Sequence, residues 1–346
     1  MFNTDYNIFF TFLTSLIITY FVIPKVIFIA EKFRLSDVPG ERASHEKSIP
    51  VFGGVAIFSG ILLSLLFWGV FDKMHIILVS LLLVFFVGII DDLLSLSPLK
   101  KLIGQILPVL LIIYFGDIKI DSMHGVLGVR ELPDLIATLF TVFVVVVITN
   151  SFNLIDGVDG LAAGIGLIAS SFFGLISLLM HQFDMAILSF SLSGSLFAFL
   201  RYNFYPARIF MGDTGSLLVG MILSILAINL IGTGLVIDTI HLPNKGPLLA
   251  IVFLSIPLFD SLRVFIVRIS DGRHPLYPGR GHIHHALLDL GVGHKITALM
   301  LYLVSCLLIM GSYFLLWLNI NLSIIILTIV SYTILIIPFY LLRRKK

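Results

Sequence analysis

Two adjacent carboxylates, Asp91 and Asp92, end one of the most apolar stretches of this sequence, LLLVFFVGII. An acidic side chain at the centre of a bilayer costs about 2.5–3.5 kcal/mol on insertion scales, so the pair must face a wet cleft or the membrane interface. Repulsion between close carboxylates makes one of them a proton acceptor near neutral pH. We therefore predict a catalytic role for both, with a simple solvated helix end as the alternative.

A third carboxylate, Asp213, lies in the turn Gly-Asp-Thr-Gly-Ser at 212–216, just before the apolar run 217–230. A turn of this kind at a helix start offers backbone N–H groups, hydroxyls and a carboxylate on one small surface. That combination suits a metal ion carrying a phosphorylated ligand. The alternative is an ordinary helix cap at the membrane boundary.

The stretch 149–164, TNSFNLIDGVDGLAAG, places polar side chains three residues apart. In a helical turn this spacing brings neighbouring members to one face. The stretch contains no basic residue, so its acids and amides need a metal ion or a polar ligand. A pair of helix caps around a turn is the alternative. The members are Asn150, Asn153, Asp156 and Asp159.

Two further loops carry basic and histidine side chains that could contact phosphate and sugar. One holds His45 and Lys47 ahead of the glycine pair that begins at Gly53, where a lipid or topology signal is the alternative. The other is the segment RGHIHH, for which zinc is the alternative although it lacks a nearby cysteine. We expect Asp260, Arg263 and Arg268, just before it, to form structural pairs. The candidate residues of RGHIHH are Arg280, His282, His284 and His285.

The elements that position these groups are membrane spans. Of 346 residues, 58% are hydrophobic and 12% are charged, about half the charged fraction of a soluble domain. A span needs about 20 apolar residues. The sequence predicts about eleven transmembrane helices, at 7–29, 51–71, 75–92, 99–116, 132–150, 161–181, 184–201, 215–235, 247–269, 295–317 and 320–342.

The basic residues predict the orientation of these spans. Eighteen of the 22 lysines and arginines fall on the side of the C-terminal Arg-Arg-Lys-Lys, which the positive-inside rule makes cytoplasmic. The N-terminus is then outside, and the loops with candidate chemistry are cytoplasmic. The first apolar run lacks the features of a cleaved signal peptide and is expected to remain as a span. The loop 116–133 alternates enough to suggest a small hairpin, and the lone Cys306 excludes a disulfide framework.

The motifs together resemble the polyprenyl-phosphate N-acetylhexosamine-1-phosphate transferases, within glycosyltransferase family 4. The resemblance covers residues 37–293 of what we expect to be one domain, 1–346. It implies an all-α membrane bundle with a cytoplasmic active-site cleft, and transfer of a sugar 1-phosphate from a UDP-sugar to undecaprenyl phosphate, with release of UMP. The matching motifs are IPVFGG, the Asp91-Asp92 pair, NSFNLIDGVDGLAAG, FMGDTGS and GHIHH.

The resemblance also implies residue roles. Asp213 and Asn153 would bind Mg²⁺, with Mn²⁺ as a substitute, and Asp91 would accept the proton of the lipid phosphate with support from Asp92. Asp156 and Asp159 would position the nucleotide or metal-bound water. The basic and histidine side chains would hold phosphates and sugar.

Val51-Phe52-Gly53-Gly54 and GHIHH place the sequence closer to the branch that uses UDP-GlcNAc and starts envelope polysaccharides such as O-antigen. The alternative branch uses UDP-MurNAc-pentapeptide. A proton-coupled transporter is the rival from another class, although its acids would lie at mid-membrane in repeated halves. We expect a bacterial cytoplasmic-membrane protein that contacts lipid, binds no nucleic acid and is able to form a homodimer.

Overall fold

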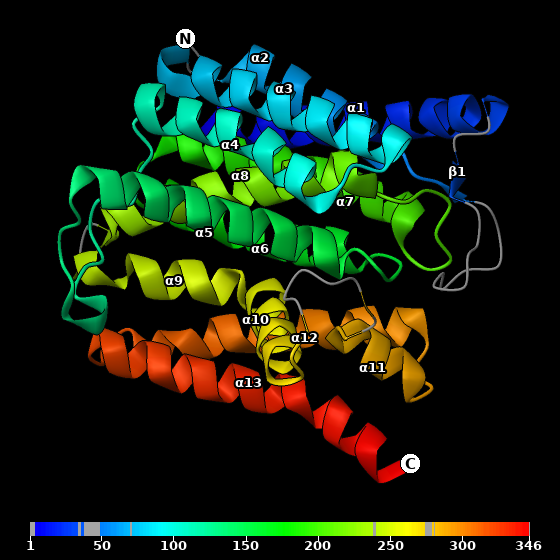
Figure 1. Cartoon of the computed structure of the whole chain (residues 1–346). Coiled ribbons are helices and arrows are strands. Elements are labelled where there is room, and N and C mark those ends of the chain that lie inside the picture. Colours follow the sequence, from blue (N-terminus) through cyan, green and yellow to red (C-terminus); the bar gives the residue numbers. More distant parts are fainter. Residues whose placement is uncertain are drawn as a thin grey trace.

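The chain is a bundle of helices that run back and forth along one axis (Figure 1). The computed structural model describes residues 4–33, 36–37, 49–69, 71–237, 240–273, 279 and 281–345. The predicted all-α membrane architecture is confirmed, and every predicted apolar run coincides with a helix or a bent pair. The helices are α1 (Thr4–Lys32), α2 (Gly53–Trp68), α3 (Phe71–Leu94), α4 (Pro98–Phe115), α5 (Asp134–Ile155), α6 (Leu161–Leu179), α7 (Phe183–Asn203), α8 (Gly212–Thr233), α9 (Gly246–Phe253), α10 (Ser255–Ser270), α11 (Ile283–Asp289), α12 (His294–Leu315) and α13 (Ile320–Lys345).

The lengths of the helices decide how many of them can span a bilayer. Among the described residues, nine helices are long and apolar enough to cross, and the bent pair α9–α10 brings the number to ten. Helix α2 is apolar but has only 16 residues, below the usual range of about 17–25. The eleventh predicted run is therefore a shorter helix.

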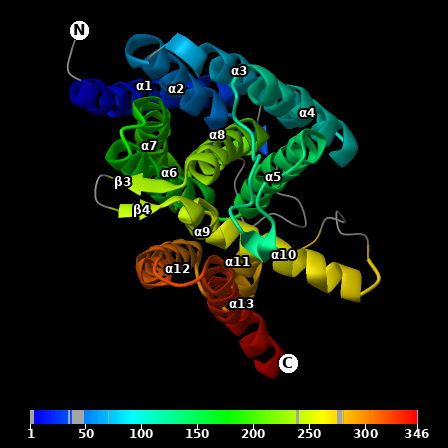
Figure 2. The same ribbon diagram turned by 90° about the vertical axis from the view of Figure 1, so that its left-hand side faces the viewer.

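The predicted span 247–269 is broken into α9 and α10, which meet at an angle of 73°. The break falls at Leu254, and Pro257 lies in the first turn of α10. Proline cannot donate the hydrogen bond that would continue α9, and its ring would clash with the carbonyl four residues earlier. Helix α10 consequently leaves the axis of the bundle and projects to one side (Figure 2).

Short strands and 3₁₀ turns occupy the connections. Strands β1 (Ser36–Asp37) and β2 (Ile49–Pro50) pair antiparallel, as do β3 (Leu235–Ile237) and β4 (Ile240–Leu242). Single 3₁₀ turns lie at Val126–Gly128 and Pro243–Lys245. The loop 116–133 contains the suggested small hairpin: an isolated bridge joins Ser122 and Glu131, and the N–H groups of Leu132 and Met123 donate to Asp121 O and Arg130 O.

Helix α8 is the centre of the bundle. Its apolar window is 83% buried, the highest value among the candidate spans of the described chain. It packs against α2, α3, α5, α6, α7 and α9, and Figure 2 shows it enclosed by several of them. A helix that is apolar on all sides belongs inside a bundle rather than against lipid. The start of α8 is thus held by neighbours on several sides.

One end of the bundle gathers the sequence motifs. Because consecutive long helices alternate in direction, α3, α5 and α7 finish at the same end where α4, α6 and α8 begin. We call this the site end; it lies to the right in Figure 1. The carboxylates Asp91, Asp156 and Asp213, far apart in the sequence, come to this end through that alternation.

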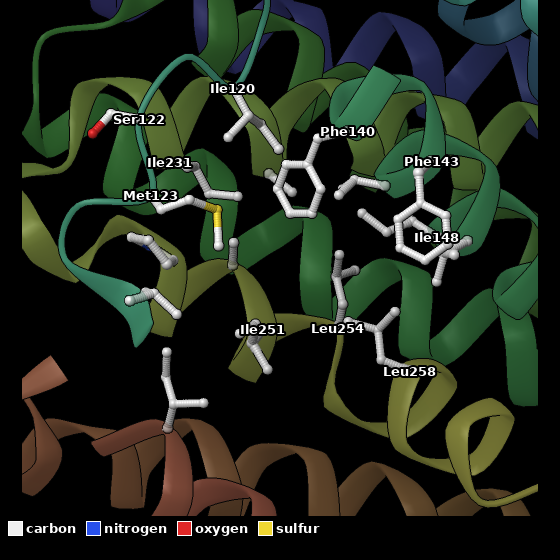
Figure 3. A pocket seen from close by; sticks show the side chains of 17 residues that line it. Ile120, Ser122, Met123, Phe140, Phe143, Ile148, Ile231, Ile251, Leu254 and Leu258 are labelled. Carbon is white, nitrogen blue, oxygen red and sulfur yellow. The ribbon is translucent and has the colours of Figure 1, made fainter. Parts of the chain in front are cut away.

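An apolar pocket of about 210 Å³ opens between α5, α8 and the α9–α10 elbow (Figure 3). Phe140, Phe143 and Ile148 of α5 face Leu254 and Leu258 across it. The loop that carries Ile120, Ser122 and Met123 closes its other side. The lining is almost entirely carbon, so the pocket suits an apolar chain.

Candidate active site

The first turn of α8 is capped by a carboxylate from α3. Asp92 Oδ1 accepts a hydrogen bond from the Asp213 N–H at 2.7 Å, and Asp92 Oδ2 accepts from the Thr214 N–H at 3.0 Å and the Thr214 hydroxyl at 2.5 Å. A carboxylate at this end also complements the positive end of the helix dipole. Asp92 therefore fixes the first turn of α8, and with it the position of Asp213.

The glycine pair of α2 lets another backbone segment approach this turn. The Gly53 N–H donates to Phe210 O and the Gly54 N–H to Met211 O, both at 2.9 Å. A Cβ at Gly54 would collide with the backbone of Gly215, and a Cβ at Gly53 would meet Phe210 O at 2.6 Å. Gly53, predicted to bind substrate, lies against the backbone that leads into α8.

Gly212 makes the turn before Asp213. Its φ of +70° is a left-handed conformation that favours glycine. An added Cβ would also lie 2.7 Å from Asp92 Oδ2. A side chain at this position would disturb both the turn and the carboxylate that caps α8.

A lysine ammonium lies at the centre of the site, among three oxygen atoms from three helices. Lys101 Nζ of α4 is 2.8 Å from Asp91 Oδ2, 2.6 Å from Asp213 Oδ1 and 3.2 Å from Asn153 Oδ1. The Lys101 and Asp91 side chains are only 13% and 5% exposed, whereas Asp213 is 30% exposed. We call these three oxygens the oxygen cage; it is open to solvent on the side of Asp213.

Lys101 was not predicted as a site residue, because in the sequence its charge contributes only to the orientation of the spans. Its neighbour Lys100 is exposed, and nothing in the pair distinguishes the two lysines by composition. The feature of the sequence that could have indicated a role for Lys101 is its position, ten residues after Asp91 and in the first turn of the next helix. A lysine in the first turn of α4 can therefore reach back to the acids that end α3.

Asn153 is held at the cage by two further bonds. Its Nδ2 donates to Asp213 Oδ1 and, at 2.8 Å, to Ser216 Oγ. One turn earlier on α5, Asn150 Nδ2 donates to Gln105 Oε1 at 3.1 Å and to Val146 O at 2.8 Å. Asn150 thus lies within the α4–α5 contact, where its amide nitrogen contacts Gln105 rather than an atom of the cage.

Asp156 follows the last residue of α5 and is partly buried. Burial, together with the negative charges of Asp213, Asp92 and Asp159, raises the pKa of its carboxyl to about 7. The group can therefore exchange a proton near neutral pH. A cation bound among these acids would favour its ionised form.

Asp159 ties two other segments to the α5–α6 loop. Its Oδ2 accepts from the Ala207 N–H at 2.9 Å, and its Oδ1 lies 3.5 Å from Nδ1 of His294 at the start of α12. The next residue is held as well, because the Gly160 N–H donates to Asn203 Oδ1 at 3.1 Å and Tyr302 donates to Gly160 O. Asp159 lies in a buried junction of loops.

The histidine segment is anchored by a buried acid of α10. Asp260 Oδ2 lies 2.8 Å from His282 Nδ1, and Asp260 Oδ1 accepts from the Ile283 N–H at 2.9 Å. Arg263 donates to Gly281 O and lies 3.8 Å from Asp260, as expected for a structural pair. Asp260 therefore fixes both the start of α11 and the orientation of the His282 ring.

Of the other two histidines, His284 packs against the α5–α6 loop and His285 lies beside His284. The rings of His282 and His284 lie 5.7 Å apart and nearly parallel, and those of His284 and His285 lie 4.2 Å apart. A Cβ at Gly157 would meet His284 Nε2 at 2.6 Å, so this ring packs on the backbone beside Asp156. The histidine segment and the α5–α6 loop, which carries Asp156 and Asp159, thus meet at the site end.

Not every predicted residue is placed by the structure. His45, Lys47 and Arg280 lie outside the described residues. The structure gathers Asp91, Asp92, Asn153 and Asp213 into one connected cluster, with Asp156 in their electric field. Asp159, Asn150 and the histidines surround this cluster. Their chemical roles stay predictions.

The oxygen cage has the donors that a small divalent cation prefers. Lys101 shows that a positive charge fits among Asp91, Asn153 and Asp213. Among the described residues, no three histidine, cysteine or acidic side chains converge as a complete metal site. Two carboxylates and one amide leave positions for substrate oxygens and water, which is the arrangement typical of Mg²⁺.

Comparison with known proteins gives one family. The profile of glycosyl transferase family 4 matches residues 74–231. The chain is 34% identical over 298 residues to a probable undecaprenyl-phosphate N-acetylglucosaminyl 1-phosphate transferase of Bacillus subtilis (strain 168), covering 85% of this chain and 81% of the relative. It is 32% identical to a decaprenyl-phosphate N-acetylglucosaminephosphotransferase of Mycobacterium leprae (84% and 79% covered), and 33% identical to a phospho-N-acetylmuramoyl-pentapeptide-transferase of Borrelia turicatae (66% and 74% covered).

Proposed function

Because this chain belongs to glycosyl transferase family 4, we propose that it transfers N-acetylglucosamine 1-phosphate from a UDP-linked donor to a polyprenyl phosphate, most simply undecaprenyl phosphate. The products are polyprenyl-diphosphate-GlcNAc and UMP. The family and the apolar helices show that the chain is a multi-pass membrane transferase. Membership in a transferase family also argues against the alternative that the chain is a proton-coupled transporter.

The names of the relatives support GlcNAc over a muramoyl-pentapeptide donor. The B. subtilis and M. leprae proteins, both named for GlcNAc 1-phosphate transfer, cover 84–85% of this chain, against 66% for the Borrelia pentapeptide transferase. The histidine segment GHIHH supports the same choice by its resemblance to that branch. A donor comparison remains the direct test.

The observation that carries the proposal is the oxygen cage at the start of α8. We propose that Asp213 and Asn153 bind Mg²⁺, or Mn²⁺ in its place, because their oxygens already surround a positive charge. When bound, the ion neutralises the diphosphate of the donor and orients it. Asp92 holds Asp213 in place through the first turn of α8.

The reaction is a substitution at the phosphorus that bears the sugar. An oxygen of the lipid phosphate forms a new P–O bond there, and the bond to the bridging oxygen breaks, so the electron pair leaves with UMP. We propose that Asp91 accepts the proton of the lipid phosphate from its place at the edge of the cage. Asp156 positions the nucleotide or metal-bound water, and Asp159 holds the loop that carries Asp156.

The remaining candidates would contact the donor. His284 lies beside the α5–α6 loop with His285 next to it, and both rings have donor groups for phosphate or sugar oxygens. We assign His282 to orientation of this segment, since Asp260 holds its ring. His45, Lys47 and Arg280 are proposed to bind phosphate on their charge alone.

We propose that the isoprenoid chain of the acceptor enters from the membrane by the apolar pocket of Figure 3. Phe140, Phe143 and Ile148 line this pocket along α5, the same helix whose last turns carry Asn153 of the cage. The distribution of basic residues supports our proposal that the site end lies on the cytoplasmic face of a bacterial cytoplasmic membrane, where UDP-sugars are available. A homodimer remains a prediction from the resemblance.

A donor panel tests the proposal. Purified protein in detergent is given undecaprenyl phosphate, Mg²⁺ and one of UDP-GlcNAc, UDP-GalNAc or UDP-MurNAc-pentapeptide, labelled in the sugar. We expect label from UDP-GlcNAc in the lipid extract, with one UMP released per label transferred. Transfer from the pentapeptide donor alone would replace GlcNAc as the substrate, and absence of transfer from every donor would reject the reaction.

A further inference from the structure

The position of Lys101 has a consequence for cation binding. Its ammonium is within 3.2 Å of each of the three cage oxygens, which come from α3, α5 and α8. Two of these oxygens, Asp213 Oδ1 and Asn153 Oδ1, belong to the residues proposed as metal ligands. A Mg²⁺ ion binds oxygen at about 2.0–2.1 Å. An ion at these two oxygens would therefore lie where the ammonium now lies.

The ammonium and a divalent cation cannot occupy this space together. Like charges this close repel strongly in a site that is largely shielded from water. Without a cation, however, the buried Asp91 and the nearby Asp213 need a compensating positive charge, which Lys101 supplies. The same lysine that stabilises the acids in one state must leave Asp213 in the other.

The side chain of Lys101 is more flexible than the oxygens it contacts. It begins in the first turn of α4 and its four-carbon stem is flexible, whereas Asp213 and Asn153 are fixed by Asp92 and Ser216. Asp91 belongs to α3 and is not one of the two proposed ligands, so its Oδ2, 2.8 Å from Nζ, can keep one contact to the ammonium. The solvent-facing side of Asp213 gives the ammonium a way toward substrate.

We propose that Lys101 is an internal counter-ion that a divalent cation displaces from Asp213 and Asn153, after which its ammonium is free to bind the donor diphosphate. The proposal rests on the proposed function, since it takes Asp213 and Asn153 as the metal ligands. It makes cation affinity a competition with a covalently tethered positive charge. Loading of the cation also prepares a phosphate-binding group.

Direct titration of Mn²⁺ tests the competition without any turnover. Binding is followed by the electron paramagnetic resonance signal of free Mn²⁺ with four purified proteins: wild type, Lys101→Met, Lys100→Met and Asp213→Asn. Lys100→Met is the matched control, because it removes the same charge from the adjacent, exposed position. Retention time on size exclusion verifies that each variant is folded.

We expect Lys101→Met to bind Mn²⁺ about tenfold more tightly than wild type, within the range usual for coupled sites. Lys100→Met should stay within about twofold of wild type, and Asp213→Asn should bind at least tenfold more weakly. If Lys101→Met binds as wild type does, or more weakly, while Asp213→Asn is impaired, displacement is rejected and the metal site stands. If Asp213→Asn binds as wild type does, the proposed metal ligands fail and displacement fails with them.

A second measurement uses only the wild-type protein. The Lys101 side chain is 13% exposed, so an amine-reactive ester should modify it slowly in EDTA. We expect Mg²⁺ to increase modification of Lys101 at least threefold, measured by mass spectrometry, with the exposed Lys100 unchanged as an internal reference. Equal modification of Lys101 with and without Mg²⁺ would overturn the proposal, even if a Lys101 variant failed to fold.

Discussion

The acidic side chains at the site end divide into those that face the cage and those that hold the backbone around it. Asp91 and Asp213 direct an oxygen to Lys101. Asp92, Asp159 and Asp260 accept backbone N–H groups in or next to the polar segments and have no contact with Lys101 among the described interactions, whereas Asp91 accepts the Leu96 N–H in addition to its contact with Lys101. Substitution of the first group should impair chemistry, whereas substitution of the second should also lower stability.

Asp91→Asn tests the proton acceptor. The amide keeps the shape of the side chain and its bond to the Leu96 N–H, but it cannot take a proton. We expect kcat to fall by about 10²–10⁴-fold, with loss of the acidic limb of the pH–rate profile. An unchanged kcat with an unchanged pH profile would remove Asp91 as the base.

Asp156→Asn tests the raised pKa of Asp156. The pKa of about 7 lies above the ordinary 3.8, so between these values the folded protein keeps a proton that the unfolded chain releases. Stability therefore falls as pH rises through this range. The asparagine side chain is neutral at every pH, so the Asp156→Asn variant does not lose this stability as the pH rises.

In EDTA, the thermal midpoint of Asp156→Asn relative to wild type should therefore rise by about 2–5 °C between pH 5 and pH 8, after allowance for solvent at this partly exposed group. The same difference at both pH values would show that Asp156 has an ordinary pKa. Mg²⁺ should reduce the effect, because a cation beside the carboxylate favours the ionised form.

Two polar contacts join α4 to α5 and keep the cage in register. Lys101 and Gln105 lie one turn apart on α4, and they contact Asn153 and Asn150, one turn apart on α5. Gln105 is buried, so its bond to Asn150 is shielded from water. The bond between Gln105 and Asn150 supports the cage from the neighbouring turn of each helix and gives the buried Gln105 a polar partner inside the helix contact.

A double-mutant cycle measures this contact. Gln105→Leu, Asn150→Ala and the double variant are compared with wild type by thermal unfolding in detergent. We expect a coupling energy of about 0.5–2 kcal/mol, typical of polar pairs between membrane helices, and a severalfold fall in kcat for each single variant. Additive effects on stability would mean that the two amides do not support each other.

The boundaries of the helices were largely predictable, but their breaks and side-chain partners were not. A run of about 20 apolar residues predicts a membrane span almost by its length alone. The motifs between the runs come to one end of the bundle because consecutive spans alternate in direction. The break at Leu254 depends on how Pro257 is packed, since proline is tolerated in many membrane helices. An apolar run that contains a proline does not by itself show whether the helix continues through the proline or breaks before it.

The cluster of Asp91, Asn153 and Asp213 could be anticipated from their shared polarity in an apolar chain. Lys101 could not, because its role depends on the angle at which α4 meets α3 and α8. The capping of α8 by Asp92 likewise joins residues that are far apart in the sequence, since Asp213 and Thr214 follow Asp92 by 121 and 122 positions. Sequence spacing contains no information about such pairs until the bundle is assembled.

Helix α1 begins at one end of the bundle and α13 ends at the other (Figure 1), because the ten candidate spans of the described chain and the shorter α2 together make an odd number of passes. The site end lies with the C-terminus, and most of the basic residues belong to segments at that end. The charge asymmetry therefore links the location of the site to the orientation in the membrane.

Single cysteines test that orientation. In a Cys306→Ser background, Lys100→Cys at the site end and Arg130→Cys at the far end are treated, in intact cells, with a thiol reagent that does not cross the membrane. We expect Arg130→Cys to be labelled and Lys100→Cys to be labelled only after lysis. The reverse pattern would place the site end outside the cell.

Asp213→Asn is the most direct test of whether the oxygen cage at the start of α8 carries out phosphoryl transfer. The measurement is the initial rate of Mg²⁺-dependent transfer from UDP-GlcNAc to undecaprenyl phosphate, with Asp117→Asn as the matched control at an exposed site 85% accessible to solvent. We expect Asp213→Asn to lose at least about 10²-fold in rate while Asp117→Asn stays near wild type. A rate for Asp213→Asn within about twofold of wild type, at the same Mg²⁺ dependence, would contradict the account.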